Sequence, residues 1–333
     1  MSVQTAIVLL NWNGWKDTIE CLQSLALLAH PSYAVIVVDN ASTDGSMAHI
    51  TKWLADQEIP GTATPLVEGP LITQDQIDGF DGSLAHRTVT LIQANQNGGF
   101  AAGNNLGLRL ALNAKSDYMW LLNNDTTVDP HALTALEKRM GEDSKIGMVG
   151  SVLCYYDQPD IIQAVGGGSF DFLRARGTQI GTGLHVSTCD LVALSNQPIT
   201  YVAGASMLVS KEFIFDAGLM FEGYFLYFEE LDWAFSGSVR WLCATAPESI
   251  VLHKEGGSIG TSSRTMRSQL SQYYLHRNLV YFYRRKRKWL TYIALAVCLK
   301  EVVKLVLKRH FSMAKITTSA LIDGVLKRHH SKQ

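Results

Sequence analysis

The chain has 333 residues, of which 47 % are hydrophobic and 18 % charged, so it can bury a full core and is not a disordered chain. The net charge of −1 hides an asymmetry. Residues 264–333 hold 16 of the 29 lysines and arginines but only two acids, a charge of +14 that leaves −15 on residues 1–263. So basic a tail favours nucleic acid or an anionic membrane surface as its partner.

Short apolar runs and helix-like segments alternate along the first 125 residues. The runs predict strands at 5–11, 33–40, 88–93 and 117–123, and helices are expected from Asp17, across 47–55 and between the third and fourth strands. Strands that alternate with helices predict an α/β fold with a doubly wound, mostly parallel sheet and a Rossmann-like nucleotide-binding half.

Two sections break this alternation. Residues 58–87, rich in proline and glycine, predict a long irregular insertion. Residues 150–200 combine glycines with aromatic residues and predict mixed strands and loops. Strand character returns at 199–210 and again from Trp241, so we expect the sheet to continue with a different topology.

From Tyr273 onward the sequence becomes helical and basic. The apolar stretch 289–299 is too short to span a bilayer. At helical spacing one side is apolar and another is basic, the two sets being Trp289, Ile293, Val297, Val303 and Val306, and Lys300, Lys304 and Lys308. With the RRKRK cluster at 284–288, this pattern predicts that residues 286–333 form a basic amphipathic helical tail on a membrane surface.

The alternative for the tail is a packed C-terminal helix with one solvated face. Nucleic acid is not favoured as a partner, because the sequence has no recognised reader motif and no interleaved aromatic and basic residues.

The five cysteines and the N-terminus bear on the compartment. The cysteines form no C-x-x-C pair and no zinc-like spacing with histidine, which favours reduced thiols. The first residues lack the positive start and long apolar run of a secretory signal. We therefore expect a cytoplasmic location.

Polar residues follow three of the predicted strands, where ligands of open parallel sheets bind. They are Asn11, Asn13, Asp39, Asn123, Asn124 and Asp125. Asp39 could accept hydrogen bonds from a nucleotide base or ribose, and Asp125 could bind a divalent cation that bridges diphosphate oxygens. Helix capping is the alternative for Asp125, although Asp129 before Pro130 fits that role better. A dinucleotide-binding glycine fingerprint and a Walker loop are absent.

A second group of candidates lies later in the chain. Glu229, Glu230 and Asp232 occur within an aromatic, apolar run, which would raise the pKa of a carboxyl and suit a general base. The alternative is the solvated side of an amphipathic helix. His253 follows another predicted strand and could contact a phosphate or a metal, or could be a structural histidine.

Six motifs, in order over about residues 4–283, together resemble one family. They are IVLLNWNGWKDTIECLQSL, VIVVDNASTDGS, NGGFAAGNNLGL, WLLNNDTTVDPHAL, VAGASMLVSKEFIFDAGLMFEGYFLYFEELDW and VLHKEGGS. The chain resembles glycosyltransferase family 2, in the branch that includes rhamnosyltransferases of bacterial cell-surface polysaccharide assembly. The resemblance implies a GT-A domain over residues 1–285, a nucleotide-diphospho-sugar donor, a Mg²⁺ or Mn²⁺ ion and an inverting mechanism.

The resemblance also assigns roles by position. Asp39 would contact the base or ribose, and Asn97 and Asn105 would help line the nucleotide site. Asp125 would bind the metal, with His253 near the diphosphate. In this chain Asn123 replaces the first acid of the family's D-x-D motif, which should weaken metal binding unless the diphosphate supplies ligands.

The base of the family's E-D pair is an aspartate, and Glu230 takes its position here. Because glutamate is one methylene longer, Glu229 and Asp232 remain alternative bases.

The predicted function is inverting transfer of a sugar, with rhamnose favoured, from a dTDP- or UDP-linked donor to a glycan or polyprenyl-diphosphate-linked acceptor. The reaction would occur at the inner face of the cytoplasmic membrane, where the tail would hold the enzyme. A nucleotidyltransferase acting on sugar phosphates and a non-catalytic, nucleotide-sugar-binding membrane scaffold are the alternatives.

Overall fold

The computed structural model describes residues 4–57, 64–254 and 268–326. Part of the predicted insertion, the end of the VLHKEGGS motif and the last seven residues of the tail lie outside these ranges.

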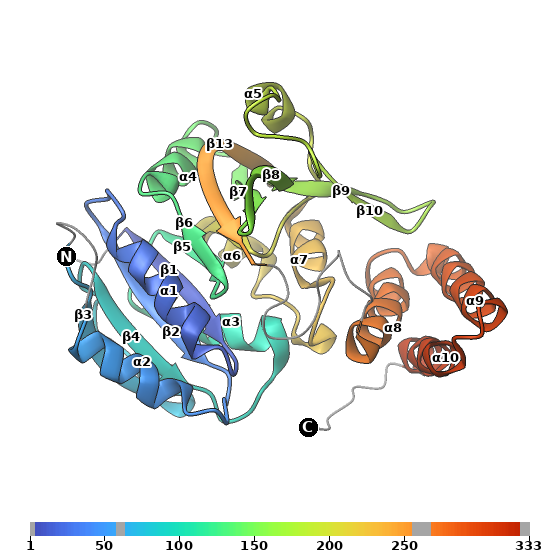
Figure 1. The fold of residues 1–333 in the computed structure, drawn as a ribbon, viewed down its shortest axis with the longest axis horizontal. Helices are drawn as coiled ribbons and strands as arrows, with labels where there is room; N and C mark the ends of the chain where they lie inside the picture. The colour runs from blue at the N-terminus through green and yellow to red at the C-terminus, as the bar shows by residue number, and fades with distance from the viewer. Residues whose placement is uncertain (1–3, 58–63, 255–267, 327–333) are drawn as a thin grey trace.

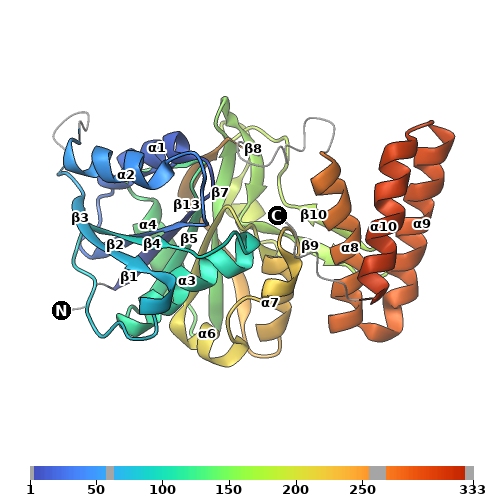
Figure 2. The ribbon, with the colours of Figure 1, turned by 90° about the horizontal axis from the view of Figure 1, so that it is seen from below.

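The N-terminal half is the expected parallel sheet. Its strands lie in the order β4-β2-β1-β5 and are β1 (Thr5–Asn11), β2 (Tyr33–Asp39), β4 (Thr88–Gln93) and β5 (Tyr118–Asn123). The apolar runs form central strands because both faces of the sheet are covered. One face packs against α1 (Trp15–Ala26), α2 (Ser46–Ala55) and α4 (Ala132–Gly141). The other packs against α3 (Gly99–Asn113), α6 (Lys211–Ala217) and α7 (Glu229–Gly237) (Figures 1 and 2).

The predicted insertion is not wholly irregular. It contributes β3 (Val67–Thr73), which pairs in parallel with β4 at the edge of the sheet, followed by the short helix η1 (Gln74–Gln76). The sequence did not indicate this strand because most of its side chains are exposed and it contains Gly69 and Pro70. An edge strand tolerates proline, since one of its sides needs no backbone donor.

The C-terminal half of the sheet changes direction, as expected. Strand β12 (Ser206–Ser210) runs antiparallel between β5 and β7 (Ile146–Tyr155). Next come β13 (Leu242–His253), parallel to β7, and β6 (Thr126–Val128), antiparallel to β13. The β13–β7 register shifts between Ala246 and Ile250.

Residues 150–200 form the predicted mixture of strands and loops. Strand β8 (Gln158–Val165) pairs with β7, and a small separate sheet joins β10 (Arg176–Gln179), β9 (Gly167–Asp171) and β11 (Tyr201–Val202). A short helix, α5 (Leu191–Ser195), precedes β11.

Three helices follow at the C-terminal end, of which the first stands beside α7 and the other two pack on its far side (Figures 1 and 2). They are α8 (Gln269–Lys286), α9 (Thr291–Leu307) and α10 (Phe311–Leu326), with a short turn, η3 (Lys288–Leu290), before α9. This helical part therefore begins within residues 1–285, the range expected to hold the GT-A domain. No helix in the described ranges combines the length and the apolarity needed to cross a membrane.

The exposed apolar side of α9 is rotated from the predicted one. Ile293 and Val297 pack partly against the aromatic cluster around α8, because the fully buried Ala294 and Cys298 turn that side of α9 inward. The apolar residues that remain exposed are Trp289, Tyr292, Leu299, Val303, Val306 and Leu307, which we call the α9 stripe.

Two glycines give a direct test of how α3 packs on β1. A Cβ at Gly107 of α3 would lie 2.4 Å from Cγ1 of the buried Val8, whereas one at Gly141, the last residue of α4, would meet nothing within 4 Å. Gly107→Ala should lower the free energy of unfolding by about 1–3 kcal/mol through overpacking. Gly141→Ala should raise it by up to about 1 kcal/mol, because alanine favours helix. Urea unfolding measures both, and equal effects would contradict the close approach of α3.

Candidate active site

The ends of β1 and β2 are joined by a buried hydrogen-bond network. Asn11 and Asp39 are 0 % and 1 % exposed, and Nδ2 of Asn11 donates to Oδ1 of Asp39 at 2.7 Å. Oδ2 of Asp39 accepts from the backbone N–H of Ser42 and from Nε2 of Gln93, both at 3.0 Å. Both carboxylate oxygens of Asp39 are thus used within the protein, where they hold the β2–α2 loop.

Asn13 joins the loop after β1 to the loop after β2 by hydrogen bonds. Its backbone N–H donates to Oγ of Ser42 at 2.9 Å, and its Oδ1 accepts from the N–H of Thr43 at 2.8 Å. Asn13 adopts a φ of 51°, a left-handed conformation that asparagine tolerates well. The predicted nucleotide-binding residues of the first two strands therefore lie together at one edge of the sheet.

The loop before α3 is held by Asn40. Its Nδ2 donates to Oδ1 of Asn97 at 2.9 Å, and its Oδ1 accepts from the N–H of Gly98. Asn97 also accepts from the N–H of Gly99 at 3.0 Å. Asn97 thus lies next to the β2 end, as its predicted role requires.

The pair Asp125 and His253 is brought together by strand register. Strands β6 and β13 pair Thr126 with His253, which places Asp125, one residue earlier, beside the histidine. Oδ1 of Asp125 lies 3.2 Å from Nε2 of His253, and both side chains are about nine-tenths buried. Asp129 serves the start of α4 instead, since its Oδ1 accepts from the N–H of His131 at 2.8 Å.

The protonation of His253 is set by a residue of β8. Oε1 of Gln163 lies 2.8 Å from Nδ1 of His253, so Nδ1 carries the proton and donates it. Nε2 of His253 is then the nitrogen available to a metal, and the Asp125 carboxylate oxygen lies 3.2 Å from it. A hydrogen-bonded partner on the second nitrogen is the usual arrangement of a metal-binding histidine.

The two asparagines of NND add no charge to the site, and they face different neighbours. Nδ2 of Asn123 lies 3.4 Å from Nε2 of His253, and Nδ2 of Asn124 donates to Oγ1 of Thr18 at 2.9 Å. Within the described ranges no three His, Cys, Asp or Glu side chains form a metal cluster. The protein thus offers a divalent ion one carboxylate and one imidazole, and further ligands must come from a bound diphosphate or water.

Glu230 faces the same edge of the sheet from α7. A Cβ placed at Gly204 would lie 3.9 Å from the carboxyl carbon of Glu230. The carbonyl of the next residue, Ala205, accepts a hydrogen bond from the N–H of Asn123 at 3.0 Å. Glu230 is partly exposed, and desolvation by its apolar surroundings raises the pKa of its carboxyl. A carboxylate that holds a proton more tightly at an accessible edge suits a general base.

The two neighbouring acids have different surroundings. Glu229 is 1 % exposed and its Oε1 has no hydrogen-bond partner. Burial, together with the charge of Glu230, raises the pKa of Glu229 well above its usual value, which favours its neutral form. Asp232 is 2 % exposed and contacts the hydroxyl of Tyr224 at 2.6 Å, Nε of Arg285 at 3.1 Å and Nζ of Lys286 at 3.0 Å. These contacts favour Glu230 as the base.

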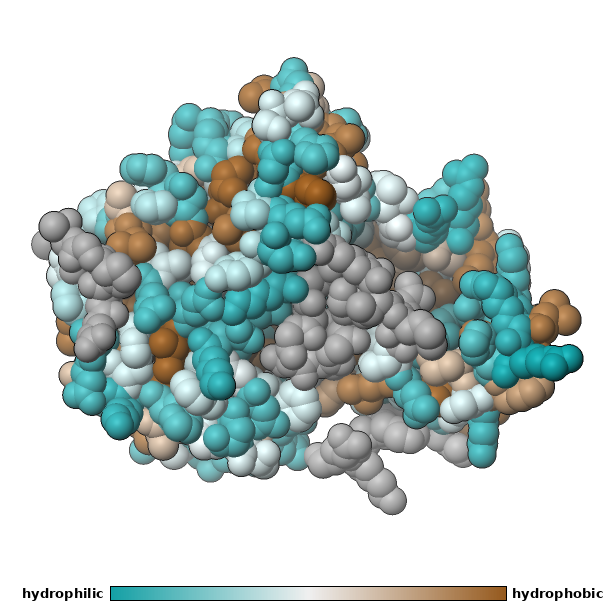
Figure 3. Space-filling model, viewed as in Figure 1, coloured by the Kyte–Doolittle hydropathy of each residue, from teal (hydrophilic) through white to brown (hydrophobic). Residues whose placement is uncertain are grey.

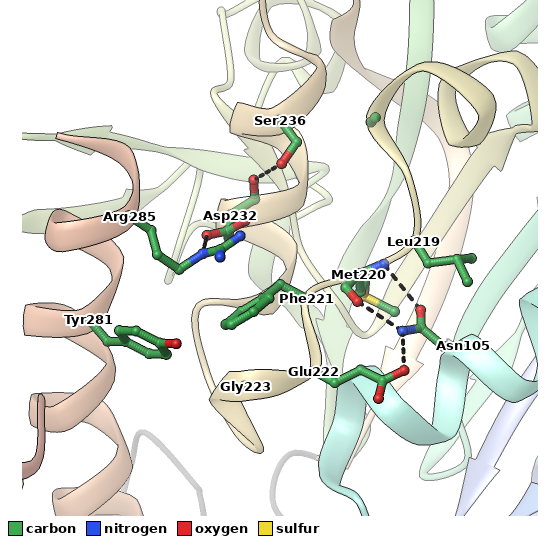
Figure 4. Close-up of a pocket in the computed structure, with 11 residues that line it drawn as sticks. Asn105, Leu219, Met220, Phe221, Glu222, Gly223, Asp232, Ser236, Tyr281 and Arg285 are labelled. Carbon is green, nitrogen blue, oxygen red and sulfur yellow. Dashed lines mark hydrogen bonds and ion pairs between the residues drawn. The ribbon is translucent and has the colours of Figure 1, made fainter. Parts of the chain in front are cut away.

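Asn105 lies elsewhere, beside a hollow of about 680 Å³ between α3, α7 and α8 (Figure 4). Its Nδ2 donates to Oε1 of Glu222 at 2.8 Å and to the carbonyl of Met220, and its Oδ1 accepts from the N–H of Met220 at 3.1 Å. Both the NH₂ group and the oxygen of the Asn105 side chain are therefore hydrogen-bonded to residues 220–222. Besides Asn105, only Asp232 among the predicted site residues lines the hollow.

Sequence reasoning missed Asn40 and Gln163. Asn40 could have been found by the strand-end rule that selected Asp39, its neighbour. Gln163 carries no local signal, because its role arises only when β8 lies beside the end of β13.

One protein-family model matches part of the chain. Residues 73–197 match the model of glycosyl transferase family 2, a region that includes the NND segment. No curated protein sequence matches the chain. The rhamnosyltransferase branch is not tested by this match.

Solved structures share the fold, which is GT-A. The mannosyltransferase PcManGT from Pyrobaculum calidifontis, in complex with GDP-Man and Mn²⁺, aligns with a TM-score of 0.56 and 14 % identity over 98 % of this chain and 88 % of its own. GalNAc-T7 with UDP, GalNAc and Mn²⁺ gives 0.55 and 15 %, over 85 % of this chain and 50 % of its own. S. aureus TarS 1-349 with UDP-GlcNAc gives 0.50 and 14 %, over 86 % and 68 %.

The role of Gln163 can be tested by calorimetry. Wild-type protein should bind Mn²⁺ weakly alone and more tightly with UDP present, because the diphosphate completes the ligand set. Gln163→Leu removes the acceptor that fixes the His253 proton, and should weaken the UDP-dependent Mn²⁺ affinity by about 10- to 100-fold. An unchanged affinity in a folded Gln163→Leu protein would contradict this assignment.

Proposed function

We propose that the protein is a glycosyltransferase that moves a sugar from a nucleotide-diphospho-sugar to an acceptor hydroxyl in a single in-line displacement, with inversion at the anomeric carbon. The observation that carries the proposal is the placement of two groups at one edge of the sheet. The Asp125–His253 pair follows Asn123 in the sequence, the Glu230 carboxyl borders Gly204, and the Asn123–Ala205 hydrogen bond joins these two segments.

On the donor side, Asp125 and His253 would hold Mg²⁺ or Mn²⁺. Such an ion neutralises the charge that develops on the departing diphosphate. The need for a cation fits the charge of residues 1–263, whose net −15 would otherwise repel a diphosphate. Because Asn123 leaves the site with one carboxylate, the donor and the ion are expected to bind together.

On the acceptor side, Glu230 takes the proton. The acceptor oxygen forms a bond to the anomeric carbon as the bond from that carbon to the diphosphate oxygen breaks, and the hydroxyl proton passes to the Glu230 carboxylate. The raised pKa of Glu230 makes it a stronger base than an exposed glutamate. The same shift means that turnover falls as the pH drops through this raised pKa.

We also propose which donor sugar and which class of acceptor the enzyme uses. The resemblance to the rhamnosyltransferase branch favours rhamnose carried by dTDP or UDP, and the basic tail favours a lipid-linked glycan as acceptor. A panel of nucleotide sugars with Mn²⁺ tests these choices. Release of nucleoside diphosphate separates a transferase from a scaffold that only binds.

The C-terminal helices support a place at the inner face of the cytoplasmic membrane. Trp289, Tyr292 and Leu307 of the α9 stripe are 72 %, 63 % and 78 % exposed, and Lys300 and Lys308 are exposed near the stripe. Hydrophobic and hydrophilic side chains lie side by side at this end of the molecular surface (Figure 3). An exposed apolar stripe beside lysines fits insertion into an anionic lipid surface.

Only part of the RRKRK cluster is free for that surface. Arg285 and Lys286 bind Asp232 of α7, and the Arg285 guanidinium lies 3.6 Å from the centre of the Phe221 ring. The membrane contact is therefore assigned to the α9 stripe and its lysines.

The base assignment predicts opposite outcomes for two adjacent substitutions. Glu230→Gln should lower kcat by about 10²- to 10⁴-fold, because the amide cannot take the proton. Glu229→Gln is the matched control: it replaces a buried neutral carboxyl by a neutral amide of the same shape and should leave kcat close to wild type. Rates of nucleoside diphosphate release from folded protein measure both. Nearly full turnover by Glu230→Gln would remove Glu230 as the base.

Membrane contact is tested by placing charge in the α9 stripe. The double substitution Leu299→Glu and Val303→Glu should reduce co-sedimentation with phosphatidylglycerol vesicles at least about tenfold, since each apolar side chain contributes roughly 1.5–3 kcal/mol on burial. Val239→Glu, at a fully exposed valine after α7, is the control and should bind as wild type does. Undiminished binding by the double variant would contradict the assignment.

A further inference from the structure

The segment before the proposed base has an unusual backbone. Residues 223–228, the base loop, lead directly into Glu229 and Glu230, and three of them have left-handed φ angles: 70° at Phe225, 69° at Tyr227 and 77° at Phe228. Bulky residues rarely adopt φ above zero without support from their surroundings. The base loop must therefore be held from outside.

One side chain of α8 holds three of its carbonyls. Asn278 is 0 % exposed, and its Nδ2 donates to the carbonyl oxygens of Tyr224 at 3.0 Å, Leu226 at 2.6 Å and Tyr227 at 3.1 Å. These carbonyls point at a single amide because the left-handed residues turn the chain around it. Buried carbonyls without such a donor would be costly to keep.

The preceding residue orients that amide. Nε of Arg277 donates to Oδ1 of Asn278 at 2.8 Å, which fixes Nδ2 toward the base loop. Nη2 of Arg277 donates to the carbonyl of Tyr224 at 3.2 Å and to that of Gly223. Arg277 is itself 3 % exposed. Two adjacent buried residues of α8 thus grip one face of the base loop.

The middle of the base loop also contacts the start of α3. The carbonyl of Phe225 accepts from the N–H of Phe100 at 2.9 Å, and a Cβ at Gly99 would lie 2.3 Å from that carbonyl oxygen. The Phe100 ring and the Glu230 carboxyl both border Gly204. Movement of the base loop would therefore move Glu230 relative to the strand ends.

We propose that Arg277 and Asn278 are positioning residues, which hold the base loop in its left-handed turn and so keep Glu230 directed at the strand ends. Neither residue touches the reacting atoms in this arrangement. The inference rests on the proposed function only in that Glu230 is the base. It makes α8, a helix of the C-terminal bundle, part of the machinery of transfer in addition to any contact with lipid.

The test compares Asn278→Ala with Gln272→Ala in the full chain. Gln272 is also a buried amide of α8, but its Nε2 donates to Oγ1 of Thr317 on α10 at 2.9 Å, and within the described ranges its side chain does not hydrogen-bond to the base loop. Both substitutions remove a buried hydrogen-bonding amide from the same helix, so both should lower stability. Only the first should release the base loop.

The first measurement is hydrogen exchange, which needs no activity. Asn278→Ala should speed exchange in peptides that cover residues 223–232 and the Phe100 amide, whereas Gln272→Ala should not. This readout separates the two hypotheses: if wild-type protein turned over no nucleotide sugar, the proposed function would fail while the exchange result would still decide whether α8 holds the base loop.

The second measurement is kinetic. Asn278→Ala should lower kcat by about 10²-fold, the cost of a misplaced catalytic group, with the KM for the donor within about threefold of wild type. Water admitted to Glu230 would lower its pKa toward the usual value, so the acid limb of the kcat profile should move to lower pH. A merely structural role would reduce the amount of active protein and leave that limb in place.

If Asn278→Ala does not fold, Arg277→Lys answers the same question, because it keeps the charge but loses the forked contact with Asn278 and the base loop. Exchange in residues 223–232 that matches Gln272→Ala, with an unmoved acid limb, would overturn the proposal for either variant. Faster exchange together with a shifted limb would support it.

Discussion

The hydrogen bond from the Asn123 N–H to the Ala205 carbonyl joins the two halves of the site. Strand β5 ends the parallel half of the sheet, and β12 runs against it, so the segment that enters β12 begins where β5 ends. Gly204, just before, lies beside the carboxyl of Glu230. The proposed metal-binding pair and the proposed base on α7 share one edge because a single antiparallel strand is inserted there.

The sequence predicted the features that depend on local patterns. The runs 5–11 and 88–93 match β1 and β4 because a strand covered on both faces needs apolar residues throughout. Asp125 was placed by the rule that ligands meet strand ends. Strand β3 was missed because an exposed edge strand needs no such pattern.

Roles that arise from distant parts of the chain could not be predicted. Glu230 and Asp232 lie two residues apart on α7. Their roles differ because Asp232 forms ion pairs with Arg285 and Lys286, more than 50 residues later in the chain. Gln163 becomes a partner of His253 only through β8, 90 residues earlier in the chain. The basic cluster, similarly, supported the predicted membrane contact, but two of its cations form ion pairs with the buried Asp232 of α7.

The register shift in β13 has a consequence for how this site can vary. Pro247, Glu248 and Ser249 lie between two stretches of β13 that pair with consecutive residues of β7, so the strand carries extra length just before its functional end. Successive side chains of a strand point to opposite faces of the sheet. Deleting one of the three unpaired residues would keep the pairing of the last stretch of β13, whereas a deletion after Ile250 would turn the His253 imidazole to the opposite face. The bulge can thus accommodate insertions and deletions, and only the stretch of β13 from Ile250 to His253 must keep its number of residues.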